Sequence, residues 1–135
     1  MKNHATPHID KLVIIGVGLI GGSFALALRQ AGVVQHITGI GRNLENMQRA
    51  LEQGVIDEIA DNYATALIDA DLLFLAMPVG QTELIMAQIA PHLEPDTIIT
   101  DAGSTKQDVI ISALKHLTPQ NIINFVPGHP IAGTE

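Results

Sequence analysis

The sequence contains no cysteine and no tryptophan, and its 135 residues include one tyrosine and three phenylalanines. Without cysteine, the chain has no disulfide, no thiolate metal ligand and no thiol nucleophile. Charged residues make up 16% of the chain, against about 25% in an average soluble domain. Fourteen acidic residues against seven basic ones give a formal net charge of −7. We therefore expect no nucleic-acid partner, because such partners need clustered Lys and Arg. We also expect no metal site, because no acidic and histidine residues have ligand spacing.

Apolar residues make up 47% of the chain and are mostly aliphatic, which is enough for one folded domain over residues 1–135. Residues 12–28 carry no charge, but Gly16, Gly18, Gly21 and Gly22 interrupt this run. The run is also shorter than the roughly 20 apolar residues that a membrane-spanning helix needs. We therefore expect no membrane partner, no secretory leader and a cytoplasmic location.

Short apolar segments alternate with amphipathic ones along the chain. The apolar segments predict strands over residues 12–15, 37–40, 72–76, 97–100 and 122–126. The amphipathic ones predict helices over residues 19–31, 44–53, 82–90 and 106–117, with Leu84 and Leu114 among the inward-facing residues. Between residues 55 and 71 the pattern is weaker and fits a short helix over 64–70 after a short strand. This alternation predicts an α/β fold with a doubly wound, mostly parallel sheet.

Residues 16–21 read GVGLIG, which matches the pattern G-x-G-x-x-G between a predicted strand and a predicted helix. Gly16 permits a tight turn, Gly18 lets the backbone approach a diphosphate, and Gly21 lets the helix pack closely on the strand. The helix that begins with Leu19 and Ile20 presents free N–H groups and the positive end of its dipole to the phosphates. We therefore predict a Rossmann-type dinucleotide site. The alternative is that these glycines only form a tight connection and bind no ligand.

The loop after the second predicted strand bears on the choice of dinucleotide. NAD-binding domains place an acidic residue there to hold the ribose hydroxyls, but no carboxylate occurs between residues 35 and 44. The loop instead reads Gly41, Arg42, Asn43, so nothing repels a 2′-phosphate and a guanidinium can bind one. We expect NADP to be preferred over NAD. The alternative is that Arg42 is a solvated charge and Glu45 contacts the ribose.

Polar residues follow three later strands, at the edge where ligands of such sheets bind. Met77 and Pro78 follow the strand over 72–76 and can pass beside a cofactor, although Pro78 is also typical of a helix start. Ser104 precedes a helix, so it can cap that helix, contact a ligand or do both. His129 lies between prolines outside any apolar face, which makes it a candidate for proton transfer or substrate polarisation.

Three segments, GVGLIGGS, DAGSTK and GHPIAGTE, together resemble the nucleotide-binding half of the prephenate and arogenate dehydrogenases of tyrosine biosynthesis. The resemblance implies oxidative decarboxylation of prephenate to 4-hydroxyphenylpyruvate, of arogenate to tyrosine, or of both. It implies that His129 accepts a hydrogen bond from the substrate hydroxyl and that Ser104 orients this histidine and contacts substrate and cofactor. It places Thr134 and Glu135 at the edge of the substrate site.

Enzymes of this family continue into a helical domain that forms a homodimer and closes the substrate site, and the resemblance covers only the half before it. We therefore expect these 135 residues to bind dinucleotide but to turn over substrate negligibly, and we expect the missing domain to cover part of their apolar surface. Two alternatives stay open at this point. One is the cofactor domain of another two-domain dehydrogenase or reductase acting on a hydroxy acid or imine. The other is a non-enzymatic nucleotide sensor.

Overall fold

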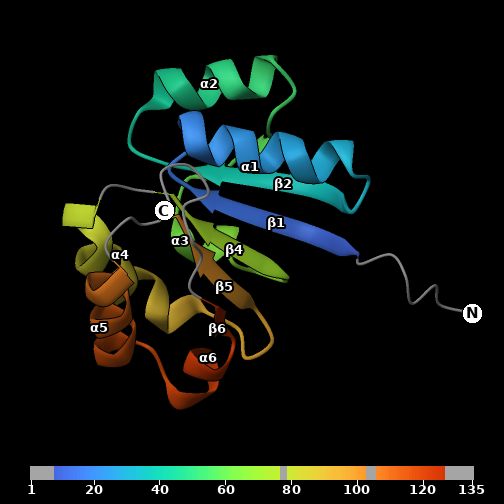
Figure 1. The fold of residues 1–135 in the computed structure, drawn as a ribbon. Coiled ribbons are helices and arrows are strands. Elements are labelled where there is room, and N and C mark those ends of the chain that lie inside the picture. The colour runs from blue at the N-terminus through green and yellow to red at the C-terminus, as the bar shows by residue number, and fades with distance from the viewer. Residues whose placement is uncertain (1–7, 77–78, 103–105, 127–135) are drawn as a thin grey trace, which may run out of the picture.

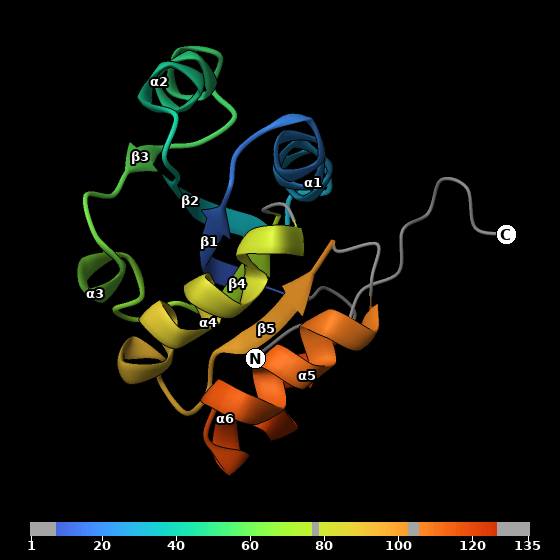
Figure 2. The ribbon, with the colours of Figure 1, turned by 90° about the vertical axis from the view of Figure 1, so that its left-hand side faces the viewer.

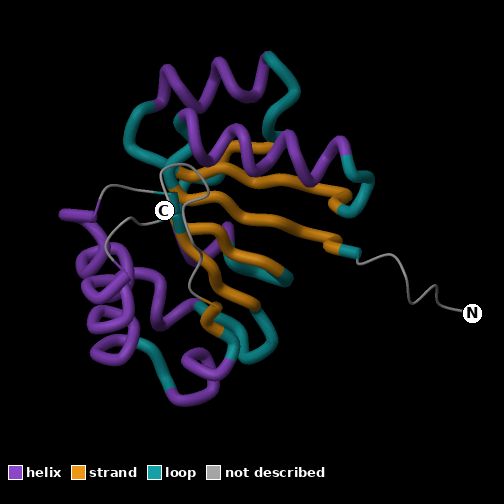
Figure 3. The backbone as a smooth tube through the Cα atoms, viewed as in Figure 1, coloured by secondary structure: helices purple, strands orange, loops and turns teal. Residues whose placement is uncertain are grey.

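The computed structural model describes residues 8–76, 79–102 and 106–126. Its centre is a six-stranded sheet in the order β3-β2-β1-β4-β5-β6, in which all neighbouring strands are parallel. The strands are β1 (Ile9–Ile15), β2 (Val34–Ile40), β3 (Glu58–Ile59), β4 (Leu72–Leu75), β5 (Ile98–Asp101) and β6 (Phe125–Val126). They lie side by side between two layers of helices (Figures 1 and 3). This order has its topological switch point between β1 and β4 and confirms the predicted doubly wound fold.

Helices cover both faces of the sheet, as Figure 2 shows in the view turned by 90°. One face carries α1 (Leu19–Gln30) and α2 (Leu44–Glu52). The other carries α3 (Tyr63–Ala66), α4 (Thr82–Ile89) and α5 (Lys106–His116). Short helices η1 (Val79–Gln81), η2 (Ala90–His92) and α6 (Pro119–Ile123) complete the connections. No helix in the described ranges is both long and apolar enough to span a bilayer.

The alternation of side chains along β1 divides the core into two clusters. Val13 and Ile15 pack with α3, α4 and α5, whereas Leu12 and Ile14 pack with α1 and α2. All four side chains are at most 2% exposed, as expected for a central strand covered on both faces. On β4, Phe74 points to the second cluster, where its ring stacks on that of Phe24 at a centroid distance of 4.0 Å. This packing fixes α1 over the sheet.

The prediction of a last strand over residues 122–126 was wrong in its first half. Residues 119–123 form α6, and only Phe125 and Val126 pair with β5. The helix begins at Thr118, whose Oγ1 accepts a hydrogen bond from the N–H of Asn121 at 3.2 Å, and Pro119 occupies the first turn. A capping residue followed by proline therefore outweighed the apolar character of the segment. Leu84 and Leu114, expected to face inward, are 57% and 63% exposed.

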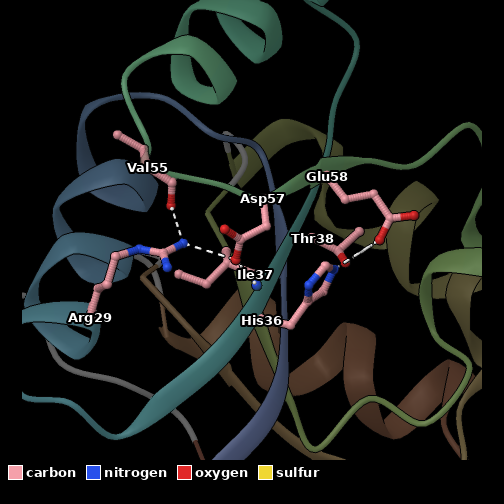
Figure 4. A network of polar contacts seen from close by, with 7 residues as sticks. All are labelled: Arg29, His36, Ile37, Thr38, Val55, Asp57 and Glu58. Atoms are coloured by element: carbon pink, nitrogen blue, oxygen red, sulfur yellow. Dashed lines mark hydrogen bonds and ion pairs between the residues drawn. The ribbon is translucent and has the colours of Figure 1, made fainter.

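A network of polar contacts ties α1 to β2 and β3 near the amino ends of these strands (Figure 4). The carboxylate of Asp57 accepts hydrogen bonds from the N–H of Ile37 at 2.8 Å and from the Arg29 guanidinium at 3.0 Å. Beside it, Nε2 of His36 lies 2.9 Å from Oε1 of Glu58. The carboxylates of Asp57 and Glu58 therefore have their polar partners within the chain.

Candidate dinucleotide site

The turn between β1 and α1 has the conformation that its glycines were expected to permit. Gly16 has φ +90°, a value that residues with a side chain rarely adopt. Its N–H donates a hydrogen bond to the carbonyl of Ile40 at 2.8 Å. A Cβ built on Gly21 would lie 2.6 Å from the Gly16 carbonyl oxygen and 3.1 Å from Cγ2 of Ile14. By contrast, a Cβ built on Gly18 would meet nothing within 4 Å. Gly16 and Gly21 therefore serve the fold, whereas Gly18 leaves open space beside the turn.

Among the α-helices whose beginnings are described, α1 is the one whose first turn has neither a side-chain cap nor an acidic residue; α4 also lacks a cap but carries Glu83. Gly18 is the N-cap residue of α1 and supplies no side-chain hydrogen bond. In α2, the Asn43 side chain accepts a hydrogen bond from the N–H of Asn46 at 3.0 Å, and Glu45 adds a negative charge. Asn62 caps α3 in the same way. The amides and the dipole of α1 are thus left for an external anion.

A hollow of about 340 Å³ lies next to this turn, at the carboxyl ends of β1, β2 and β4. Its lining comes from the end of β1 and the turn after it, from the β2–α2 connection with the start of α2, and from the segments that follow β3 and β4. The lining residues are Ile15, Gly16, Val17, Gly18, Gly41, Arg42, Asn43, Asn46, Met47, Tyr63, Ala76, Gln81 and Ile85. This edge is where open α/β sheets bind ligands. The structure therefore brings the predicted glycine turn and the predicted loop after β2 to one concave surface.

Gly41 and Arg42 lie where the sequence placed them, beyond the end of β2. A Cβ on Gly41 would lie 3.0 Å from Cε of Met47 and 3.9 Å from Cα of Gly16. Position 41 thus faces the glycine turn, and a carboxylate there would stand directly beside the hollow. Instead, the charged residue among the described lining of the hollow is Arg42. The hollow has no carboxylate among its described lining residues, in a chain whose acids outnumber its bases two to one.

The sequence did not point to Tyr63 or Gln81, which line the hollow from α3 and η1. Burial raises the pKa of the Tyr63 phenol above 10.0, although the positive charge of Arg42 opposes this shift. The phenol is therefore neutral at physiological pH and can donate a hydrogen bond. Tyr63 reaches the hollow through the packing of α3 against β2 and α4, which are distant in the sequence, so no local motif signalled it.

The remaining predicted site residues lie outside the described residues. These are Met77, Pro78, Ser104, His129, Thr134 and Glu135. Leu19 and Ile20 begin α1 as expected, and the side chain of Ile20 is 58% exposed. No group of three or more acidic or histidine side chains that could hold a metal ion occurs within the described ranges.

The strand order, the glycine turn and the hollow at the switch point together define an α/β domain of the dinucleotide-binding class. A family model described as "Prephenate dehydrogenase, nucleotide-binding domain" matches residues 24–135. The chain belongs to this family, which confirms the resemblance carried by its three sequence segments.

Proteins named as prephenate or arogenate dehydrogenases align with most of this chain. The prephenate dehydrogenase of Bacillus subtilis (strain 168) is 39% identical over 126 residues, which cover 93% of this chain and 33% of that protein. A structure of prephenate dehydrogenase from A. aeolicus in complex with hydroxyphenyl propionate and NAD+ is similar with a TM-score of 0.81 and 35% identity, over 93% of this chain and 43% of that one. The structure of Synechocystis arogenate dehydrogenase is similar with a TM-score of 0.76 and 32% identity, over 92% of this chain and 42% of that one. The chain thus spans less than half the length of these relatives.

Proposed function

We propose that this chain is the nucleotide-binding half of an NADP-preferring dehydrogenase that oxidatively decarboxylates prephenate, arogenate or both. The observation that carries the proposal is the uncapped first turn of α1, which opens beside Gly18 onto a hollow without carboxylates. The names of the similar proteins supply the reaction class. The products would be carbon dioxide with 4-hydroxyphenylpyruvate from prephenate, or with tyrosine from arogenate.

The residues present fit a dinucleotide. The amides from Leu19 to Gly21 would hold its diphosphate, and the space beside Gly18 admits the phosphate oxygens. Arg42 would pair with a 2′-phosphate, which Gly41 does not repel. Tyr63 and the apolar wall of the hollow would cover the adenosine half. The bound cofactor would supply the hydride acceptor, and we assign its contacts after β4 to Met77 and Pro78, which follow this strand in the chain.

We assign the substrate chemistry to residues that follow β5 and β6 in the chain. His129 would accept the hydrogen bond of the substrate hydroxyl and take its proton as the ring carbon loses hydride. Ser104 would hold this imidazole and contact the same hydroxyl. Loss of carbon dioxide then makes the ring aromatic. Thr134 and Glu135 would line the edge of the substrate site.

Turnover would need residues beyond these 135. A substrate with two carboxylates needs cationic partners, and the chain contains only seven Lys and Arg. Arg42 is assigned to the cofactor, and Lys106 follows β5 in the chain as the first residue of α5. A helical domain, as expected from the resemblance, would supply the missing partners, form a homodimer and cover apolar residues such as Leu114. The enzyme would act in the cytoplasm.

Calorimetric titration of the chain with NADP and with NAD tests this proposal. We expect both to bind and NADP to have the lower Kd. Tighter binding of NAD would contradict the cofactor preference, and binding of neither would contradict the proposed function itself. We also expect no measurable prephenate-dependent NADPH formation by these 135 residues. Appreciable turnover would show that no further domain is needed.

A further inference from the structure

A second hollow, of about 430 Å³, lies between α1 and α2. Its walls are Gly22, Ser23 and Leu26 of α1 and Asn46, Arg49 and Ala50 of α2, together with Val17, Gly18, Gln53 and Val55. Val17, Gly18 and Asn46 also line the first hollow, so the two hollows share a rim. The rim includes Gly18, the residue at which a diphosphate would approach the backbone. The second hollow is therefore an extension of the proposed cofactor site rather than a separate surface feature.

Arg49 gives this extension a positive charge that no described residue neutralises through an ion pair. Among the cationic side chains that the structure describes, Lys11, Arg29 and Lys115 have polar partners within the chain. Arg42 and Arg49 have no ion pair with any described residue, and each lines one of the two adjoining hollows. As in the first hollow, the described lining of the second contains no carboxylate. In a chain of net charge −7, two unpaired cations around one rim favour an external anion.

The position of Arg49 on α2 suits a ligand at the rim. Arg49 lies three residues after Asn46, so both side chains share one face of the helix. Long side chains on helices lean toward the helix N-terminus, and here the N-terminus of α2 adjoins Gly41 and Arg42. The Arg49 side chain is exposed, as is that of Ser23 across the groove. The Arg49 guanidinium can thus reach toward the rim that the two hollows share.

The charge of the expected ligand calls for a second cation. A phosphate monoester carries about −1.5 to −2 charges near pH 7, whereas Arg42 supplies a single positive charge. We propose that Arg49, assisted by the Ser23 hydroxyl, is a second specificity-determining residue that binds the 2′-phosphate of NADP from the α1–α2 groove. This inference rests on the proposed function, because it names the groups that read the 2′-phosphate at the same site.

Titration of single variants of the 135-residue chain tests this assignment. The variants are Arg49→Gln, Arg42→Gln and the control Lys115→Gln, which removes the same charge from α5. For Arg49→Gln we expect the Kd of NADP to rise about tenfold, as for loss of one charge-assisted hydrogen bond, and the Kd of NAD to change less than about twofold. The same selectivity should appear with adenosine 2′,5′-bisphosphate against ADP as probes. Thermal unfolding should be nearly unchanged, because the Arg49 side chain is exposed.

The titrations separate this inference from the cofactor preference. The ratio of the two Kd values for the unmodified chain tests the preference alone, whereas the change produced by Arg49→Gln tests the role of Arg49. If Arg42→Gln weakens NADP selectively and Arg49→Gln does not, Arg42 alone reads the phosphate and the inference is overturned. Equal weakening of NADP and NAD by Arg49→Gln would also overturn it, because the contact would then not involve the 2′-phosphate. A similar rise in the Kd of NADP for Lys115→Gln would mean that net charge alone causes the effect, which would also overturn the inference.

Discussion

The two ends of β2 both carry arginine close by, but the chain uses these residues in opposite ways. Near the amino end, Arg29 is bound to the carboxylate of Asp57 and, at 3.4 Å, to the carbonyl of Val55. Beyond the carboxyl end, Arg42 and Arg49 line hollows and form no ion pair with a described residue. The same contrast holds for α1, whose last turn is tied to Asp57 through Arg29 and whose first turn has neither cap nor acid.

This difference separates groups that hold the fold together from groups that are left for a ligand. Polar groups that complete their hydrogen bonds internally stabilise the folded chain and need nothing from outside. At the other end, no described acidic residue forms an ion pair with Arg42 or Arg49, so both guanidinium groups are available to an anion. The contrast predicts that substitutions at one end change stability, whereas those at the other change affinity.

We expect the largest effect at Gly21, where α1 packs against the glycine turn. Gly21→Ala would place Cβ 2.6 Å from the Gly16 carbonyl oxygen, so α1 must move away from β1. We expect the free energy of unfolding to fall by about 2 kcal/mol or more in urea denaturation, because overpacking outweighs the better helix propensity of alanine. The control is Gly22→Ala, whose Cβ would meet only Cγ1 of Val55 at 3.8 Å. This control should be neutral or stabilising, and equal losses in both variants would contradict the packing role of Gly21.

At Gly18 we expect a smaller effect, which falls on cofactor affinity and not on stability. A methyl group there meets no atom of the chain within 4 Å, and the residue does not have a positive φ. Gly18→Ala should therefore change the free energy of unfolding by less than about 1 kcal/mol. It should raise the Kd of NADP and of NAD alike by about tenfold or more in calorimetry, because the methyl group occupies the space of the diphosphate. Unchanged affinity would mean that the phosphates lie elsewhere.

The smallest effect concerns the paired end of β2 and its dependence on pH. Burial alone would raise the pKa of Asp57, but the hydrogen bonds from the Ile37 amide and Arg29, with the charges of Arg29 and His36, lower it below 3.8. Because the folded-state pKa lies below the unfolded one, the stabilisation is complete above about pH 4 and is lost as the pH falls through the folded-state pKa.

Asp57→Asn should therefore lower the free energy of unfolding by less than about 1 kcal/mol at pH 7, since the side chain of Asp57 is 35% exposed. The difference from the unmodified chain should shrink in urea denaturation at pH 3. Glu52→Gln, which removes an exposed carboxylate of α2, serves as the control and should show no such trend. A difference that is the same at both pH values would exclude the proposed role of the Asp57 charge.

The sequence predicted the layers of the fold well, because buried parallel strands and the turn at Gly16 leave strong local patterns. It failed where a local signal competed with an apolar run, as at Thr118, whose capping hydrogen bond begins a helix in place of a strand. It also failed at Leu114, where periodicity alone does not tell which helix face meets the sheet. In the site, Arg42 was predictable from its place after a strand. Tyr63 was not, because it reaches the hollow through packing between distant segments.

Amide chemical shifts, measured by NMR during titration with NADP, test most directly whether the uncapped end of α1 binds the phosphates of a dinucleotide. We expect the largest changes at Gly18 and Gly21 and at Arg42 beyond β2, with little change at Arg29 and Asp57. Shifts confined to other regions, or none at saturating NADP, would contradict it.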